Sequence, residues 1–435
     1  AWSDNSTSMN SGLFRLLDLR QGQSTPYARC YSLIFHMSEA YPLIRLATAL
    51  ALMTLGCSAM YASVMVLEPA ALEFKTGRGS SSLIYAAFSV GFAFGGLVMG
   101  RLADRIGIMF PAIIGSLALP AGLYLAAHGD SILEISLALS ILCGFLGTSF
   151  TFAPLVADIS HWFDRRRGLA VGIAFSGSYV AGALWPPVLQ HWFDDQGWRE
   201  SLIDLALLTA ILMLLLSILL YPKPRISDHP ESDHSQGNNS PSLSMSAGMI
   251  QSLICLAGFG CCAAMAMPQI HIVPYVMDLG HPAIRGAEML GLMLGFGVIS
   301  RIVSGWLSDR IGGLATLLIG STLQLAVLIA FLTGNSLVFL YGISIAFGLS
   351  QGGIVPSYTM ILRAFFPPKQ AGWRISMSFL FTVIGMAFGG WIAGLLYDLT
   401  GSYTVSFVNA IGFNILNLWI AASLLKKARL IGIRA

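Results

Sequence analysis

Charged side chains are scarce in this sequence. They make up 10% of its 435 residues, whereas hydrophobic residues make up 55%. Soluble globular proteins carry about 25% charged residues, so a chain this poor in charge could not cover a surface that faces water. The net charge of +3 is also too small to indicate a protein that binds nucleic acid. The composition therefore favours a protein that exposes apolar side chains to lipid.

Sequence signatures of catalysis and of metal binding are missing as well. The six cysteines form no CxxC pair, no HExxH segment occurs, and the 46 glycines are dispersed rather than gathered in a phosphate-binding loop. No credible set of Ser, His and Asp for nucleophilic catalysis stands out. We therefore expect no enzyme activity, no cofactor and no metal ion.

Long apolar segments fill most of the chain. A helix needs about 20 mainly apolar residues to cross the hydrocarbon core of a membrane, and twelve segments meet this requirement. Their approximate ranges are 44–67, 81–101, 108–128, 132–158, 168–190, 201–221, 247–277, 286–306, 313–333, 337–361, 372–396 and 404–425. The sequence thus predicts an all-α membrane protein with twelve transmembrane helices in two six-helix bundles.

A polar stretch rich in Pro, Ser, Asp and His separates the sixth apolar segment from the seventh. This composition is typical of a flexible connection. The predicted organisation is a disordered N-terminal tail at 1–42, a six-helix bundle at 43–221, a cytoplasmic linker at 222–246, a second six-helix bundle at 247–425 and a cytoplasmic tail at 426–435.

Lys and Arg are distributed unevenly between the predicted loops. The loops on one side hold most of them, whereas the loops on the other side hold only Lys75, Arg78, Arg199 and Arg285. Basic residues collect on the cytoplasmic side of membrane proteins. We therefore expect both termini in the cytoplasm. The expected location is the cytoplasmic (inner) membrane, and the chain is expected to act as a monomer.

A short motif occurs twice, at equivalent places in the two halves. Gly100-Arg-Leu-Ala-Asp-Arg-Ile-Gly107 is repeated as Gly305-Trp-Leu-Ser-Asp-Arg-Ile-Gly312. Each copy ends the second predicted helix of its half, so the halves read as duplicated units in parallel topology. Glycine permits a tight turn and the close approach of helices, and ionised groups at this helix end can pair between the bundles. The predicted gating residues are Gly100, Asp104, Arg105, Gly107, Gly305, Asp309, Arg310 and Gly312.

This duplicated motif resembles the loop signature of the major facilitator superfamily. The resemblance covers residues 43–425 and implies a transporter in which the motif acts as a latch on one state of the cycle. A second segment, Trp162-Phe-Asp-Arg-Arg-Arg-Gly168 and the helix after it, resembles the monocarboxylate transporters and the related oxalate/formate exchangers. The Gly-Pro element and the helix 4 Arg of drug antiporters are absent, which argues against multidrug efflux.

One basic residue lies well inside a predicted helix. Arg301 precedes Asp309 by eight residues, which places it about 12 Å from the cytoplasmic end of the helix. That depth is near the middle of a core about 30 Å thick. A charge there usually faces a cavity, and a guanidinium binds a carboxylate through two hydrogen bonds. We prefer substrate binding to the alternatives, an Arg that snorkels to the surface or pairs with a carbonyl.

The segment around Arg301 also resembles helix 8 of the monocarboxylate carriers, whose Arg binds the substrate carboxylate. Those carriers often place an Asp one turn before the Arg, where this chain has Gly297. The dicarboxylate exchangers add a Lys in helix 11, and this chain has no basic residue there after Arg374. A single buried cation suits a substrate with one negative charge.

Other polar residues could complete a site at similar depth. His271 titrates near neutral pH and lies between Pro268 and Pro274, which we expect to break the helix. It is a candidate for substrate binding and proton coupling; the alternative is a His that hydrogen-bonds a neighbouring helix. Further candidate lining residues are Tyr61, Tyr179, Tyr275, Gln351, Tyr358 and Ser376. Asp398, near a helix end, is expected to be an interface charge.

Together these features predict a secondary active transporter. The first hypothesis is uptake or exchange of a small, monocarboxylate-like organic anion by alternating access, with the proton as a candidate co-substrate. One alternative is an exporter of an uncharged or amphipathic metabolite. Another is a transporter-like sensor that binds a ligand without moving it. The expected partners are the solute and the lipid bilayer, with no nucleic acid.

Overall fold

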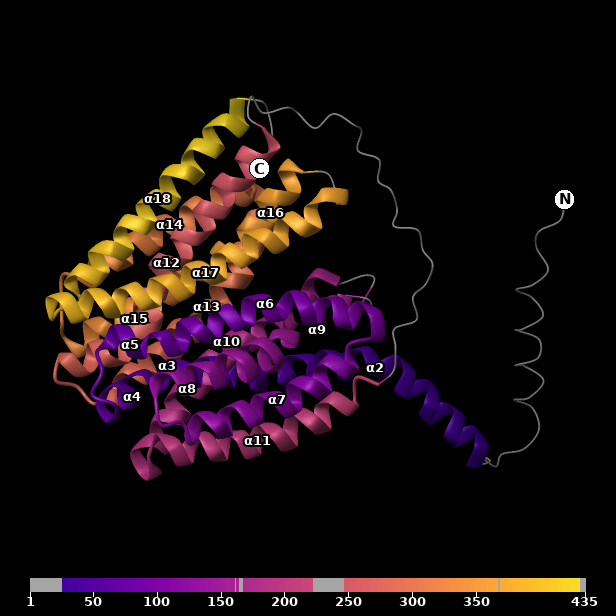
Figure 1. Ribbon diagram of the computed structural model, residues 1–435. Coiled ribbons are helices and arrows are strands. Elements are labelled where there is room, and N and C mark those ends of the chain that lie inside the picture. The colour runs from indigo at the N-terminus through magenta and orange to yellow at the C-terminus, as the bar shows by residue number, and fades with distance from the viewer. Residues whose placement is uncertain (1–25, 161, 164–166, 222–245, 367, 431–435) are drawn as a thin grey trace. The chain divides into compact units, whose positions relative to one another are not determined.

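The computed structural model describes residues 26–160, 162–163, 167–221, 246–366 and 368–430 (Figure 1). Every regular element among these residues is helical. Contacts divide the chain into two units, residues 1–45 and residues 46–435. The second unit holds the features described below.

Helices of the N-terminal half precede the polar stretch at 222–245. They are α2 (Pro26–Gly56), α3 (Ser58–Met65), α4 (Leu67–Glu73), α5 (Arg78–Ser81), α6 (Leu83–Ile106), α7 (Met109–Ala127), α8 (Ile132–Leu137), the π-helix η1 (Ala138–Thr148), the 3-10 helix η2 (Ser149–Thr151), α9 (Ala153–Ser160), α10 (Arg167–Gln196) and α11 (Trp198–Ile218).

The C-terminal half consists of longer helices. They are α12 (Ala247–Asp278), α13 (Ala283–Ile311), α14 (Gly313–Ala330), α15 (Leu337–Gln351), α16 (Ile354–Phe365), α17 (Pro368–Thr400) and α18 (Tyr403–Leu430).

Eleven helical stretches among the described residues are long and apolar enough to cross a membrane. The first residues of α10 are only partly described, and α10 is not among the eleven, although its 30 residues exceed the length that a span requires. With α10 the helices correspond to the twelve predicted segments. The prediction of an all-α membrane protein is confirmed.

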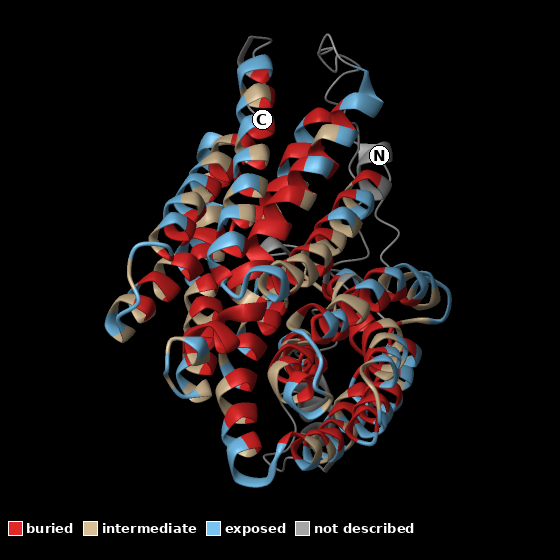
Figure 2. Cartoon of the chain, turned by 60° about the vertical axis from the view of Figure 1, so that its left-hand side comes forward, coloured by how far each residue is buried: buried red, intermediate tan, exposed pale blue. Residues whose placement is uncertain are grey.

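Apolar side chains on the outer faces of the helices agree with this assignment. Leu207, Ile211 and Leu215 follow one another at four-residue spacing on α11 and are each about 60% exposed. Residues four apart lie on the same face of a helix, so they form one exposed apolar stripe. Figure 2 shows buried residues between neighbouring helices and exposed residues along their outer sides. Such faces are suited to lipid and unsuited to water.

The N-terminal region differs from its prediction. Residues 1–25 of the predicted disordered tail and residues 222–245 of the predicted linker lie outside the described residues. Residues 26–42 of that tail belong to helix α2. Proline is tolerated in the first turn of a helix, and α2 continues through Pro42 and ends at Gly56.

Three predicted helices are interrupted, and the first of them, the segment 44–67, is divided among α2, α3 and α4. The segment 132–158 is divided among α8, η1, η2 and α9, and the segment 337–361 is divided at Gly352 between α15 and α16. Close packing explains the last division, since a Cβ at Gly352 would lie 2.3 Å from the carbonyl oxygen of Gly297 on α13. The predicted break in α12 is wrong, because that helix runs unbroken through its two prolines.

The two halves meet mainly through two helix pairs. Helix α10 packs against α13, and α6 packs against α17. The repeated motif lies at one end of α6 and of α13, which we call the motif end; the opposite end, where α5 also contacts α17, we call the Arg78 end. Gly107 and Gly312 end their helices with nearly identical φ values of +92° and +87°, which confirms the predicted tight turn in both copies.

Candidate functional site: a cavity between the two halves

Two adjoining cavities lie between the halves. The larger has a volume of about 880 Å³, and its lining includes Leu97, Val171 and Arg363, which lie on helix segments near the motif end. The smaller has a volume of about 160 Å³. Both cavities are lined by Phe92, Phe152, Val355, Phe379 and Thr382. The two together match the size of ordinary small-molecule sites.

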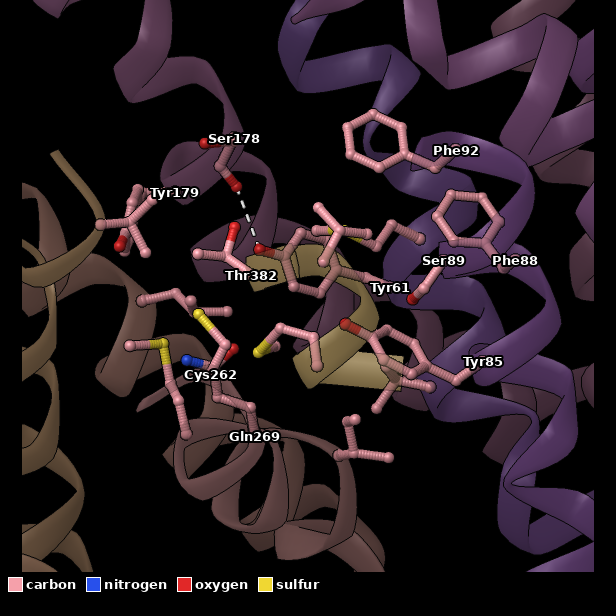
Figure 3. A pocket seen from close by; sticks show the side chains of 18 of the residues that line it. Tyr61, Tyr85, Phe88, Ser89, Phe92, Ser178, Tyr179, Cys262, Gln269 and Thr382 are labelled. Atoms are coloured by element: carbon pink, nitrogen blue, oxygen red, sulfur yellow. Dashed lines mark hydrogen bonds between the residues drawn. The ribbon is translucent and has the colours of Figure 1, made fainter. Parts of the chain in front are cut away.

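The smaller cavity is predominantly apolar and aromatic, with a few polar groups (Figure 3). The Tyr61 hydroxyl, on α3, donates a hydrogen bond to the carbonyl oxygen of Ser178 on α10 at 3.1 Å. Close packing holds this pair, since a Cβ at Gly182 would lie 2.5 Å from the Tyr61 hydroxyl oxygen. The cavity thus offers aromatic faces with isolated polar atoms, an arrangement suited to a ligand with an apolar body.

Arg301 lies behind this lining. Its guanidinium carbon is 4.3 Å from the centre of the Tyr179 ring, and its Nε donates to the carbonyl oxygen of Gly352 at 3.3 Å. Arg301 forms no ion pair with a carboxylate of the described residues. Tyr179 lines the smaller cavity, whereas Arg301 lines neither cavity. Arg301 thus pairs with a carbonyl, one of the alternatives to substrate binding, and lies outside both linings, against the Tyr179 ring.

Other predicted lining residues divide between the cavities. Tyr61 and Tyr179 line the smaller cavity, and Tyr358 and Ser376 line the larger one. Gln351 is buried behind the smaller cavity, where its side chain accepts a hydrogen bond from Gln269, a lining residue. Four predicted residues thus reach the cavities directly, and Gln351 reaches one through a neighbour.

His271 and Tyr275 lie elsewhere. The Nε2 of His271 is 2.7 Å from the carbonyl oxygen of Gly390, and its Nδ1 is 3.1 Å from the Tyr403 hydroxyl. A carbonyl only accepts, so Nε2 carries the hydrogen and donates. Tyr275 packs among aromatic rings, including Phe331 and Phe407. Neither residue lines either of the two cavities. His271 hydrogen-bonds the neighbouring helix α17, as the alternative to its predicted role expects, and its Nε2 also lies 3.5 Å from the Ser82 hydroxyl of the N-terminal half.

The Arg78 end is closed by a charged cluster that joins the halves. Arg78 donates two hydrogen bonds to Asp278 at 2.5 and 2.8 Å, and two to Glu68 at 3.2 Å each. Its guanidinium carbon is 4.0 Å from the centre of the Tyr397 ring. Asp278 and Tyr397 belong to the C-terminal half, whereas Arg78 and Glu68 belong to the other. We call these residues, with Asp398, the Arg78 cluster.

Asp398 completes the cluster through the backbone. Its two carboxylate oxygens accept the N–H groups of Arg78 and Gly79 at 2.7 Å each. A Cβ at Gly77 would lie 2.4 Å from Oδ2 of Asp398, so this approach requires glycine. Asp398 is thus an interface charge, as predicted.

A second charged group fixes loops within the N-terminal half at the same end. Glu73 accepts hydrogen bonds from Trp198 at 2.8 Å and from Arg199 at 2.7 and 3.1 Å. Arg199 also donates to the carbonyl oxygens of Ala127 and Gly129. The hydrogen bonds from Arg199 hold the pKa of the Glu73 carboxyl below its ordinary value.

The charges of the repeated motif, in contrast, are unpaired among the described residues. Asp104, Arg105, Asp309 and Arg310 are exposed, and none forms an ion pair with a described residue. The predicted close approach of helices at Gly100 and Gly305 is wrong, since an added Cβ at either would meet no atom within 4 Å. The molecule is therefore closed at the Arg78 end, and the cavity lies toward the motif end.

Several residues of this arrangement were not predicted. Gln269 and Tyr85 line the smaller cavity, and Arg78 was identified only as a loop charge. A signal existed for Gln269, a polar residue two positions before His271 in an apolar segment. For Arg78 the signal was its place among the few basic residues on its side of the predicted topology.

Known proteins resemble the chain in sequence and in fold. The family model of the Major Facilitator Superfamily matches residues 47–343 and 296–430. Monocarboxylate transporter 13 of Bos taurus is 26% identical over 334 residues, covering 75% of this chain and 76% of the relative. The agnestins efflux protein AgnL12 of Paecilomyces divaricatus is 25% identical over 286 residues, covering 65% and 64%.

Among solved structures, a bacterial homologue of the human lysosomal transporter Spinster, in an inward-facing and unoccupied conformation, superposes with a TM-score of 0.68. It is 14% identical, and the match covers 90% of this chain and 98% of that one. At this identity the likeness concerns the fold alone.

Proposed function

Because this chain belongs to the Major Facilitator Superfamily and is a membrane transporter, we propose that it moves a small organic anion with an apolar body by alternating access. The observation that carries the proposal is Arg301, a cation at membrane depth that has only a ring and a carbonyl as described partners. An ionisable group at this depth is costly unless it serves a ligand or a pathway. The relationship to monocarboxylate transporters supports a carboxylate as the group that Arg301 receives.

The direction of access follows from the distribution of charge. Basic residues mark the cytoplasmic side of membrane proteins, and most of them lie in the loops of the motif end. On this assignment the termini are cytoplasmic, the cavity opens toward the cytoplasm, and the Arg78 cluster closes the outer side. The unpaired charges of the motif then form their latch in the opposite state, when the cytoplasmic side closes. Uptake or exchange in the inner membrane is the corresponding activity.

Proton coupling through His271 forms part of the proposal. His271 lies beside Tyr403, whose ring is 5.3 Å from the guanidinium of Arg78. A proton gained by His271 would place a positive charge next to the Arg78 cluster, where it would repel Arg78 and attract the carboxylates of the cluster, and so alter that closure. The coupling group would thus act on the outer closure and have no contact with the substrate.

The experiment is uptake of labelled carboxylates into proteoliposomes by the full-length protein. Acetate, pyruvate and phenylacetate vary the apolar body, and phenylacetamide removes the charge. Hydrogen bonds to charged groups contribute about 1.5–3 kcal/mol, so Arg301→Gln should lower kcat/KM for the anions at least about tenfold. Arg285→Gln, which removes a charge from the same helix in an exposed pair with Glu288, is the control. Unchanged anion uptake by Arg301→Gln would refute the carboxylate assignment.

The same vesicles test the coupling. An imposed pH gradient, acidic outside, should accelerate anion uptake by the wild type, and His271→Asn should lose that acceleration. If the gradient has no effect in either protein, proton coupling is wrong while anion transport stands.

A second candidate function is export of an uncharged or amphipathic metabolite. It is favoured by the aromatic lining of the smaller cavity, by the absence of Arg301 from that lining, and by the similarity to a protein described as an efflux protein. Equal transport of phenylacetamide and phenylacetate, with Arg301→Gln active on both, would select this function.

A further inference from the structure

We infer that Tyr179 is a specificity-determining residue that competes with the substrate carboxylate for Arg301. This inference rests on the proposed function and adds to it a residue from the opposite half of the molecule. Tyr179 belongs to α10 and Arg301 to α13, so the competitor and the cation are carried by different halves.

The contact between the two side chains is a cation–π interaction. The guanidinium carbon of Arg301 lies 4.3 Å from the ring centre of Tyr179, well inside the range of about 6 Å for such contacts. Both residues are only partly exposed. The ring thus provides electron density to a cation that has no carboxylate partner among the described residues.

Gly297 provides the space for this contact. It lies one turn before Arg301 on α13, and a Cβ built there would lie 2.4 Å from Cε1 and 2.6 Å from Cδ1 of the Tyr179 ring. Atoms at these distances overlap, so any side chain at position 297 would move the ring. The stacked position of Tyr179 therefore depends on a glycine of the opposite half.

The ring also stands between the cation and the ligand space. Tyr179 lines the smaller cavity, and Arg301 lines neither cavity. A carboxylate that arrives through the larger cavity consequently meets the aromatic face before the guanidinium. To form its two hydrogen bonds with Arg301, the anion must displace the ring.

Two consequences follow for the carrier. When no substrate is bound, the ring keeps the partly exposed cation partnered, which lowers the cost of its partial desolvation. When the substrate binds, the cation–π contact is lost, and its free energy reduces the binding free energy of the anion. Tyr179 thereby weakens anion binding, and an uncharged ligand that does not use Arg301 is spared this penalty.

The first test removes the ring. Purified full-length protein in proteoliposomes is assayed for equilibrium binding and uptake of labelled phenylacetate. Tyr179→Leu should tighten phenylacetate binding about 5- to 30-fold, which is a cation–π contact of about 1–2 kcal/mol converted at 1.4 kcal/mol per tenfold. KM should fall, and the maximal rate should fall with it, because tighter binding of the ground state slows release. Tyr179→Phe keeps a ring and should give a smaller gain.

The second test moves the ring from the other helix. Gly297→Ala should displace Tyr179 and produce a gain of the same kind, whereas Gly295→Ala is the matched control, since its Cβ would meet only Ala183 at an ordinary 3.6 Å. Because both changes act on one contact, the Tyr179→Leu and Gly297→Ala gains should not add. Phenylacetamide should bind all variants alike, which separates the loss of the ring contact from a mere enlargement of the cavity.

Three outcomes would overturn the inference. They are no gain for phenylacetate in Tyr179→Leu and Gly297→Ala, an equal gain for phenylacetamide, or a gain that persists when Arg301→Gln is added. The proposed function fails separately, through unchanged anion uptake by Arg301→Gln alone in the otherwise wild-type protein. A Tyr179 variant that does not fold leaves Gly297→Ala to decide.

Discussion

At the scale of single residues, the two glycines that end α6 and α13 have a conformation that other residues avoid. Gly107 and Gly312 combine φ near +90° with ψ near +160°, a region that is essentially restricted to glycine and costs other residues about 1–3 kcal/mol. We therefore predict that Gly312→Ala lowers the free energy of unfolding by about that amount. The melting temperature of the purified protein in detergent is the measurement.

The repeated motif supplies the control for this substitution. Gly305 is in the same motif but inside α13, and an added Cβ there would meet no atom within 4 Å. Alanine is a better helix former than glycine, so Gly305→Ala should leave the melting temperature equal or raise it. Equal losses of stability in both variants would show that the backbone conformation is not the cause.

The depth of Arg301 could be predicted from the sequence, but its partner could not. Counting residues from the end of the helix gives the position of a side chain along the helix axis. The contact with Tyr179 depends on how α10 and α13 are placed against each other, and the sequence of neither helix records that register. Gly297 was recognised as a departure from related carriers. That it leaves room for the Tyr179 ring could be learned only from the packing of the two helices.

At the scale of elements, one ionic contact joins the last residue of α4 to the start of α11. The Glu73 pKa is lowered chiefly by its hydrogen bonds with Arg199. A carboxyl with a depressed pKa stabilises the folded state above its unfolded pKa, about 4.3, and this contribution is lost as the pH falls through the lower, folded value. We predict that Glu73→Gln lowers the melting temperature at pH 7. Below about pH 4.3, the melting temperature of this variant should fall less steeply with decreasing pH than that of the wild type.

Glu200 is the control for this pH dependence. It neighbours Arg199, is exposed, and forms no ion pair with a described residue. Glu200→Gln should preserve the acid decline of the wild type. If the melting temperature of Glu73→Gln falls with decreasing pH as steeply as that of the wild type, other carboxyl groups cause the acid sensitivity.

Elements differ in how well their interruptions could be predicted. Prolines suggested a break in α12, but the helix continues through both, whereas α15 and α16 are separated at a pair of glycines. The cause of that separation is close contact with α13 at Gly352. The local sequence shows where a helix can be interrupted, and the packing of the neighbouring helix determines whether it is interrupted there.

At the scale of the whole molecule, the Arg78 cluster joins the two halves at one end. Arg78→Gln removes the charged hydrogen bonds to Asp278, which contribute about 1.5–3 kcal/mol each. We predict a shift of about tenfold or more toward a state that is open at the Arg78 end. Spin labels at Thr76→Cys and Leu399→Cys, one on each half, should report a larger population of long distances.

Arg285→Gln is the matched control for this shift. Arg285 lies at the same end but pairs with Glu288 three residues away on its own helix, so its loss leaves the contact between the halves intact. The distance distribution should remain that of the wild type. Identical distributions in Arg78→Gln and wild type would exclude the cluster as the closing contact.

The division of the molecule into two related halves was predictable because one motif occurs at equivalent positions of both halves. The repeated motif predicted equivalent turns at Gly107 and Gly312, and their φ values agree within 5°. The state of the molecule was not predictable, since the same motif is compatible with paired and unpaired charges. Only the positions of Arg78 and Asp398 on opposite halves show which end is closed.

The volume of the larger cavity has a consequence for hydration. About 880 Å³ corresponds to roughly 30 water molecules at about 30 Å³ each. An anion of a few heavy atoms would displace only a small part of that solvent. Most of the water would therefore stay in the cavity while the carrier changes between its two states. A bulkier solute would release most of the solvent from apolar walls, which gains free energy in proportion to the area covered. Osmotic stress during uptake would therefore affect transport of a small solute more than transport of a large one.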